Sequence, residues 1–75
     1  MHTGMLWFDN SKRSTKEKIQ EAVNYYVKKY GIMPDLCWMN PKSLDKDIPQ
    51  IDGLSIRPYR PVLPGHIWIG IEDKG

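Results

Sequence analysis

The sequence predicts a small, two-layer α+β domain, with one amphipathic helix packed on a mixed sheet of four or five strands. Two patterns support this prediction. Apolar residues recur at helical spacing from Ile19 to Tyr30, and short apolar or alternating stretches of strand length lie on both sides of that segment. The length of 75 residues fits one domain over residues 1–75.

The helix is the best-marked element of the chain. Ser14 is a suitable N-cap residue, and Glu17 follows three residues later, as a capping box requires. The apolar face continues to Tyr30, after which Gly31 can cap the C-terminus and Pro34 prevents continuation. We therefore expect one helix between Ser14 and Gly31.

The strands are predicted from short apolar segments bounded by turn residues. In chain order they are expected at residues 5–9, 35–41, 48–51, 54–59 and 66–72. The first two flank the helix, which predicts a β-α-β crossover with these two strands parallel. The pair Asp52-Gly53 lies between apolar residues and predicts a β-hairpin that joins the third strand to the fourth. Residues 41–47 are polar and fit a single helical turn.

Alternation along the strands predicts an aromatic patch on the sheet face that points away from the helix. In the last strand the isoleucines face the helix, so Trp68 faces away. The side chains expected on this outward face are Trp7, Trp38, Arg57, Tyr59 and Trp68. The orientation of strands 5–9 and 36–40 stays open, because a shift by one residue would turn Trp7 and Trp38 into the core.

Three interpretations compete for this aromatic face. The chain termini and the loop RPVLPG, residues 60–65, could cover it and bury the tryptophans. A homodimer or a protein partner could bind it, since aromatic residues and Arg are enriched at the centre of interfaces. It could also bind a ligand by stacking the bases of a single-stranded nucleic acid.

A second candidate surface lies at the start of the helix, where cations gather although the helix dipole disfavours them. An anion such as phosphate, bound by the free backbone N–H groups, would offset this conflict. The candidate residues are Lys12, Arg13, Ser14, Lys16 and Lys42, with Arg57 and Arg60 as additional contacts to nucleic acid. In the simpler alternative, water and salt screen these charges and Glu17 and Glu21 compensate them.

Composition narrows the classes of function. The net charge of +2 permits an anionic partner but is lower than that of most nucleic-acid-binding domains. The single cysteine, Cys37, forms no internal disulfide, and we expect an inert buried thiol there. His2 and His66 do not have the spacing of metal ligands, so neither a metal nor a cofactor is expected. A hydrolase that uses Asp9 and Ser11 has the least support, because no base orients them.

The segment PDLCWMNPKSL, residues 34–44, resembles the Pro-strand-Asn-Pro segment that follows a helix in phage major capsid proteins. The resemblance implies a phage-derived assembly role as an alternative, although the chain is far too short for a capsid subunit. No stretch is apolar over the roughly 18 residues of a membrane span, and no secretory signal is visible. We therefore expect a cytoplasmic location.

From these observations we expect a small non-enzymatic interaction domain. It would associate with itself, or bind another protein, through the aromatic open face of its sheet. Binding of an anion or a nucleic acid at the basic start of the helix is the alternative from a different class.

Overall fold

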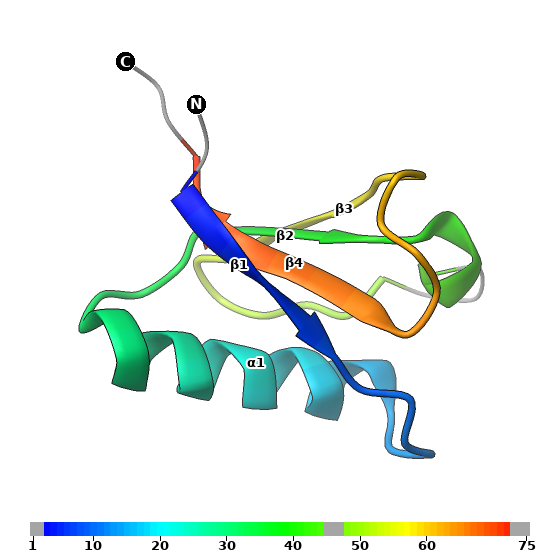
Figure 1. Cartoon of the computed structure of the whole chain (residues 1–75), viewed down its shortest axis with the longest axis horizontal. Coiled ribbons are helices and arrows are strands. Elements are labelled where there is room, and N and C mark those ends of the chain that lie inside the picture. Colours follow the sequence, from blue (N-terminus) through cyan, green and yellow to red (C-terminus); the bar gives the residue numbers. More distant parts are fainter. Residues whose placement is uncertain (1–2, 45–47, 73–75) are drawn as a thin grey trace.

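One helix lies against one face of a four-stranded sheet (Figure 1). The structure is a computed structural model and describes residues 3–44 and 48–72. Its elements, in chain order, are β1 (Thr3–Phe8), α1 (Thr15–Tyr30), β2 (Leu36–Met39), the 3-10 helix η1 (Pro41–Leu44), β3 (Ser55–Pro58) and β4 (His66–Ile71). The predicted α+β class, with one helix on a small mixed sheet, is confirmed.

The order of strands across the sheet is β1-β4-β2-β3. β4 is antiparallel to both of its neighbours, β1 and β2, whereas β2 and β3 are parallel. β1 and β2 therefore run in the same direction, as the predicted crossover requires, but β4 lies between them. Local sequence patterns give the direction of these strands and cannot show which distant strand is inserted.

Both predicted caps of α1 are present. The Ser14 hydroxyl oxygen accepts a hydrogen bond from the Glu17 backbone N–H at 3.2 Å and donates one to Glu17 Oε1 at 3.1 Å. At the other end Gly31 has a left-handed conformation, with φ 75°, and its N–H donates to the Val27 carbonyl at 2.7 Å. A residue with a Cβ atom would be strained in that conformation, which explains glycine at this position.

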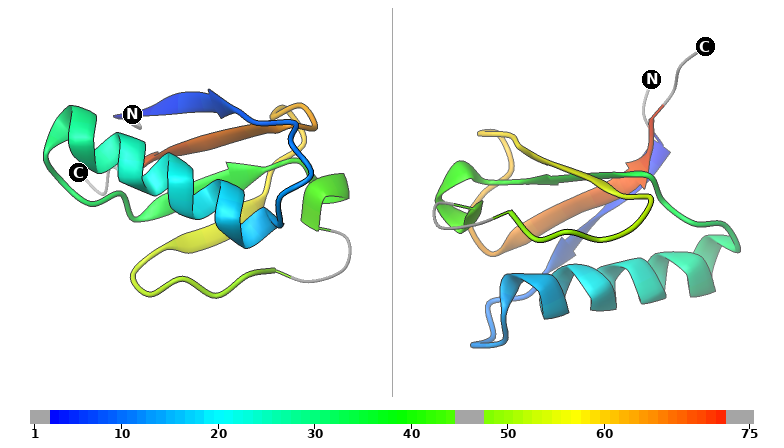
Figure 2. Two further views of the ribbon diagram at one scale, coloured as in Figure 1. Left: turned by 90° about the horizontal axis from the view of Figure 1, so that it is seen from below. Right: turned by 180° about the vertical axis from the view of Figure 1, so that it is seen from behind.

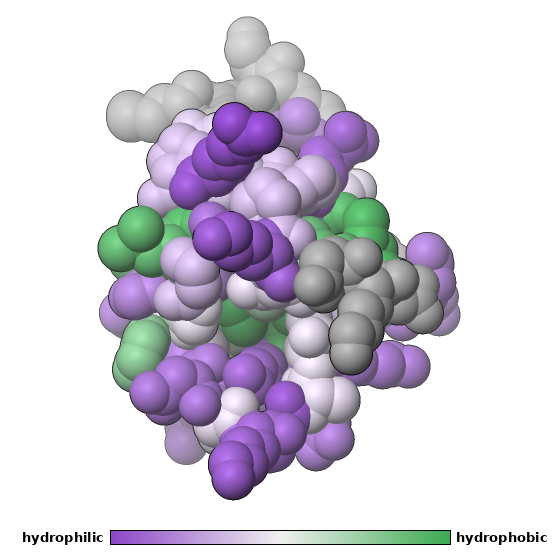
Figure 3. All heavy atoms as spheres, turned by 90° about the vertical axis from the view of Figure 1, so that its right-hand side faces the viewer, coloured by the Kyte–Doolittle hydropathy of each residue, from purple (hydrophilic) through white to green (hydrophobic). Residues whose placement is uncertain are grey.

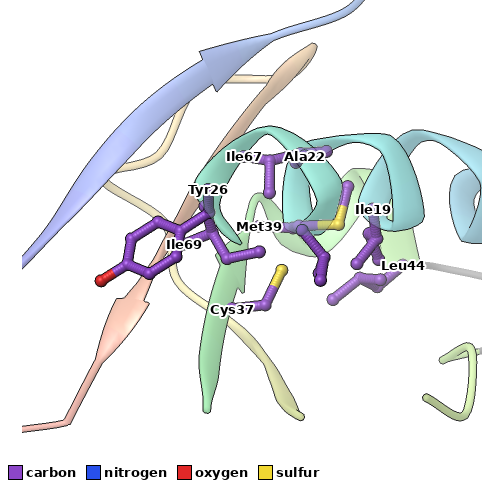
Figure 4. Close-up of a cluster of buried hydrophobic side chains, with 9 residues drawn as sticks. Ile19, Ala22, Tyr26, Cys37, Met39, Leu44, Ile67 and Ile69 are labelled. Carbon is purple, nitrogen blue, oxygen red and sulfur yellow. The ribbon is translucent and has the colours of Figure 1, made fainter. Parts of the chain in front are cut away.

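The hydrophobic core lies between α1 and the sheet face beneath it (Figures 2 and 4). Its buried members are Ile19, Ala22, Val23 and Tyr26 from the helix, Cys37 and Met39 from β2, Ile67 and Ile69 from β4, and Leu44 from η1. The β2 and β4 members alternate along their strands, so each strand presents one face to the helix. This inner face contains no buried polar side chain among the described residues.

The predicted hairpin was wrong. Residues 48–51 form no strand, and Asp52-Gly53 forms a tight turn in which the Leu54 N–H donates to the Ile51 carbonyl at 3.1 Å. β3 follows this turn and pairs in parallel with β2. Ile51 and Leu54 pack against the core instead, and Pro49 has no N–H for a strand ladder. The helical turn predicted over 41–47 is observed as η1, and residues 45–47 lie outside the described part of the chain.

The predicted orientation of β1 was also wrong. Met5 and Trp7 pack against the core, and the Trp7 ring lies 5.0 Å from that of Tyr25, centroid to centroid. Leu6 and Phe8 point the other way and are 61% and 56% exposed. The physical reason is that MLWF is apolar at every position, so alternation does not reveal which side is buried. Trp7 is the residue whose long side chain reaches the helix from the edge of the sheet.

Candidate interaction face

The sheet face opposite α1, here called the outer face, carries a row of three aromatic rings. Trp38 in β2 lies opposite Trp68 in β4, and their rings stack at 4.7 Å with 27° between the planes. Tyr59, just after β3, lies on the other side of Trp38 at 4.5 Å and 30°. The outward orientation predicted for these three side chains is therefore observed. Trp7 is the predicted member that lies on the opposite face.

Arg57 belongs to the outer face by its position in the strand. It is the register partner of Trp38 in the β2–β3 pair, and it is exposed. Paired residues of neighbouring strands point to the same side of a sheet. A cation therefore borders the aromatic row at the β3 edge.

Gly4 explains how the Trp68 ring can approach β1 so closely. A Cβ atom at position 4 would collide with the Trp68 ring and would lie 2.6 Å from the Ile69 carbonyl oxygen. Since real Cβ atoms do not approach other atoms so closely, the indole position depends on the missing side chain. Gly4 is thus a structural part of the aromatic face.

The segment between β3 and β4 forms a wall above the sheet and creates an apolar hollow. Its position is fixed by Asn40, whose side-chain NH₂ donates to the Val62 carbonyl at 3.0 Å, and by the burial of the Val62 side chain. The hollow has a volume of about 400 Å³ and is lined by Leu6, Trp38, Tyr59, Pro61, Val62, Leu63, His66 and Trp68. This size lies within the range of known small-ligand and side-chain pockets.

Exposed apolar side chains surround this hollow. Leu63 is 64% exposed on the loop wall, and Leu6 and Phe8 are exposed on β1. Phe8 packs on His66, with ring centroids 4.8 Å apart. The loop over residues 59–65 thus covers part of the outer face, as one of the three interpretations expected, but it leaves an open apolar surface beside it.

The aromatic row is arranged poorly for stacking bases. Trp38 is enclosed between Tyr59 and Trp68, so both of its ring faces are already occupied within the chain. Proteins that bind single strands need free ring faces for successive bases. The outer face therefore offers mainly the edges of its rings and aliphatic side chains, which suit contact with an apolar protein surface.

At the start of α1, Arg13 is held by carboxylates. Its guanidinium pairs with Asp9 at 3.1 Å and with Glu21, and its Nε donates to the Ser11 hydroxyl oxygen at 3.3 Å. Hydrogen bonds from Ser11, followed by the charge of Arg13, lower the pKa of Asp9. These contacts answer why a cation stands at a helix start. Arg13 joins the end of β1 to the side of the helix and pairs with a carboxylate from each.

The remaining anion-binding candidates do not converge with Arg13. Lys42 lines a pocket of about 390 Å³ with Asn40, Pro41 and Arg60, whereas Lys16 lines a different pocket that includes Asp52. Ser14 is used as the N-cap, and Lys12 is exposed. The surface at this end of the molecule is mostly hydrophilic (Figure 3). The basic residues there belong to three separate sites: the Arg13 contacts, the Lys42 pocket and the Lys16 pocket.

The residues considered for catalysis have structural roles, in a turn or in the core. Asp9 accepts from the Ser11 backbone N–H at 2.9 Å, so the pair forms a local turn, and a lowered pKa makes Asp9 a weaker base. Burial raises the pKa of Cys37 to about 12, so its thiol stays protonated and unreactive, as predicted. The described residues contain no group of three or more His, Cys, Asp or Glu side chains that could hold a metal ion.

Sequence reasoning missed the contributions of Leu6, Phe8 and Leu63 to the outer face. The outward orientation predicted for Trp7 implies, by alternation, that Leu6 and Phe8 face the helix, and the structure shows the opposite for all three. Leu63 lay in a proline-rich loop, and no local pattern indicates that such a loop folds back over a sheet. The available signal was a leucine between two prolines, Pro61 and Pro64, which leaves an apolar side chain on a constrained loop.

Comparison with protein-family models, with curated proteins and with solved structures gives no match for this chain. Among the residues that the structure describes, α1 and η1 are both too short or too polar to cross a membrane.

Proposed function

We propose that this protein is a small interaction domain that binds protein, either a second copy of itself or a different chain, through the outer face. The observation that carries the proposal is the apolar hollow beside the Tyr59–Trp38–Trp68 row, with Leu6 and Leu63 exposed around it. Exposed apolar side chains grouped around a hollow are typical of interaction sites. A single buried cysteine without a disulfide framework fits a cytoplasmic location.

The energetic argument rests on the burial of apolar surface. Each square ångström of apolar area removed from water contributes about 25 cal/mol, so covering several large exposed side chains provides a substantial driving force. The residues around the hollow are mainly aliphatic and aromatic, and its polar groups belong to His66, Tyr59 and the two tryptophans. A partner that presents apolar side chains in an extended or ridged arrangement would match this surface.

The test places a photo-crosslinking residue on the outer face. Phe8 is 56% exposed, and Phe8→p-benzoylphenylalanine is a conservative change that puts the reactive ketone on that face. The matched control is the same replacement at Tyr30, which is 41% exposed at the end of α1. We expect irradiation to yield covalent adducts, with a second copy or another protein, from position 8 and not from position 30.

Two outcomes of this experiment would count against the proposal. Absence of adducts from position 8, in purified protein and in cells, would leave the outer face without a partner. Equal yields from positions 8 and 30 would show that the contacts are random collisions.

A second candidate function has narrower support. Lys42 and Arg60 line one pocket with Asn40, which brings two cations together at the hydrophilic end of the molecule. We propose this pocket as a weak site for an anion such as the phosphate of a nucleic acid. Phosphate contacts weaken steeply as salt increases. Titration with a short single-stranded oligonucleotide at low salt should shift the Lys42 and Arg60 amide resonances, and unchanged resonances would exclude this site.

A further inference from the structure

The two edges of the sheet differ in how they are protected against pairing with another strand. β3 is short, and it carries Arg57 and Pro58, a charge and a residue without an N–H. β1 spans six residues, Thr3–Phe8, with the sequence TGMLWF, and contains neither a charge nor a proline. Natural proteins usually block exposed edges with charges, proline or short strands. The unprotected β1 edge therefore points to a strand that pairs there.

The backbone groups available at this edge can be identified. The Asp9 N–H donates to the Gly65 carbonyl at 2.9 Å, which fixes the phase of the β1–β4 ladder at that end. In an antiparallel ladder the residues whose N–H and C=O groups face the partner strand alternate with residues whose groups face away. The backbone groups of Gly4, Leu6 and Phe8 consequently point away from β4, toward the open edge.

We propose that β1 pairs antiparallel with β1 of a second copy, about a two-fold axis perpendicular to the sheet, to form one continuous eight-stranded sheet. This inference rests on the proposed function, and it identifies the protein partner as a second copy of the chain. Because both copies present the same strand, the contact is closed and needs no third molecule.

One register satisfies all of the free edge groups. In this register Leu6 lies opposite Leu6 of the second copy, and Gly4 lies opposite Phe8. The free backbone N–H and C=O groups of Gly4, Leu6 and Phe8 in one copy then face the free groups of the other copy. Directly opposed residues share one face of the sheet, so the Leu6 side chains meet on the outer face. Phe8 of the second copy then lies at the edge of the Trp68 ring, which itself covers Gly4. An aromatic residue opposite a glycine is a stabilising cross-strand pair.

Charge also favours a second copy as the occupant. A symmetric strand pair brings each residue close to its own equivalent, so any charge on the strand would repel itself. β1 has none, although 27% of the chain is charged. The joined sheets would also place the two apolar hollows on one surface, since Leu6 lines each hollow.

The test uses opposite charges at position 6. In Leu6→Lys and in Leu6→Glu like charges meet across the two-fold axis, so we expect each variant to weaken self-association by at least about tenfold in analytical ultracentrifugation. An equimolar mixture of the two variants should restore the dimer, because Lys then faces Glu. Met33→Lys is the matched control, since Met33 is 60% exposed against 61% for Leu6, and it should associate like the unmodified chain.

A measurement on the unmodified chain protects the test against variants that fail to fold. Backbone amide exchange at Gly4, Leu6 and Phe8 should slow as protein concentration rises, because dimer formation hydrogen-bonds these groups. A chain that stays monomeric to about 1 mM would overturn the inference. Self-association that leaves these three amides unprotected would also overturn it, while the proposed function would stand on the adducts from position 8.

Discussion

The two faces of the sheet are both apolar, yet they are covered in different ways. On the inner face Ile67 and Ile69 of β4 are almost completely excluded from solvent by α1. On the outer face Trp68, which stands between them in the same strand, is only half-buried and is covered by a stacked ring and a loop. One helix can cover only one face, so a domain of this size must close its second face with other means or leave it for a partner.

This difference separates stability from binding. A fully buried aliphatic side chain contributes to folding through burial and close packing, and its neighbours cannot adjust when it is removed. A side chain that is mostly exposed contributes little to folding and keeps its apolar area for a partner. The following substitutions test whether the two faces of this protein divide in that way.

The largest effect is expected at the inner face. Ile69→Ala removes a side chain with no exposed surface from the centre of the core, and comparable truncations cost about 2 to 5 kcal/mol. In a chain of 75 residues this is a large part of the total stability. Thermal and urea unfolding, followed by circular dichroism, measure the change. Ile32→Ala is the control, because Ile32 is 51% exposed, and a similar loss there would remove the contrast.

A smaller effect is expected where the outer face is tightly packed. Gly4→Ala places a methyl group against the Trp68 ring and 2.6 Å from the Ile69 carbonyl oxygen, which the backbone holds in place. We expect a loss of about 1 to 3 kcal/mol, as for other overpacked sites. The near-ultraviolet circular dichroism of the stacked indoles should change as well. Ser55→Ala, at an exposed β3 position, should leave both measurements unaltered.

The inner face was largely predictable from the sequence, and the outer face only partly. The caps and apolar periodicity of the helix are local signals, so the region between Ser14 and Gly31 was predicted correctly. Clean alternation in β4 placed Trp68 outward with equal success. In both cases the physical cause lies within a few residues along the chain.

The errors arose where the local structure depends on contacts with distant parts of the chain. β1 is apolar at every position from Met5 to Phe8, so its burial depends on which side the helix packs. Asp52-Gly53 does form a turn, but the turn does not join two strands. β3 pairs in parallel with β2, and residues 48–51 form no strand. The hollow depends on the loop over residues 59–65, whose fold across the sheet is set by tertiary contacts such as Asn40 to Val62.

An effect of about 1 kcal/mol is expected at alkaline pH from Cys37 on the inner face. Burial raises the pKa of its thiol from an ordinary value of 9.0 to about 12. The unfolded thiol ionises first, so the stabilisation is fully present below pH 9 and is lost as pH rises toward 12. Between pH 9 and pH 10 the linkage costs about 1 kcal/mol.

The comparison with Cys37→Ala isolates this contribution, since other groups titrate in the same range. The difference in free energy of unfolding between the two proteins should shrink as pH rises above 9. In the native protein, Ellman's reagent should react only after unfolding. A thiol that reacts rapidly under native conditions would mean that the inner face is open to solvent.

The smallest effect is expected at Leu63 on the outer face, and it decides how that face is interpreted. Leu63 is 64% exposed on the wall of the hollow, so Leu63→Ala should change the free energy of unfolding by less than about 0.5 kcal/mol. Urea unfolding at a low protein concentration measures this change without a contribution from association. A loss as large as that of Ile69→Ala would mean that Leu63 is buried in solution and that the hollow is closed. A near-zero change leaves a large apolar side chain exposed with no role in folding, which is the condition that a binding surface must meet.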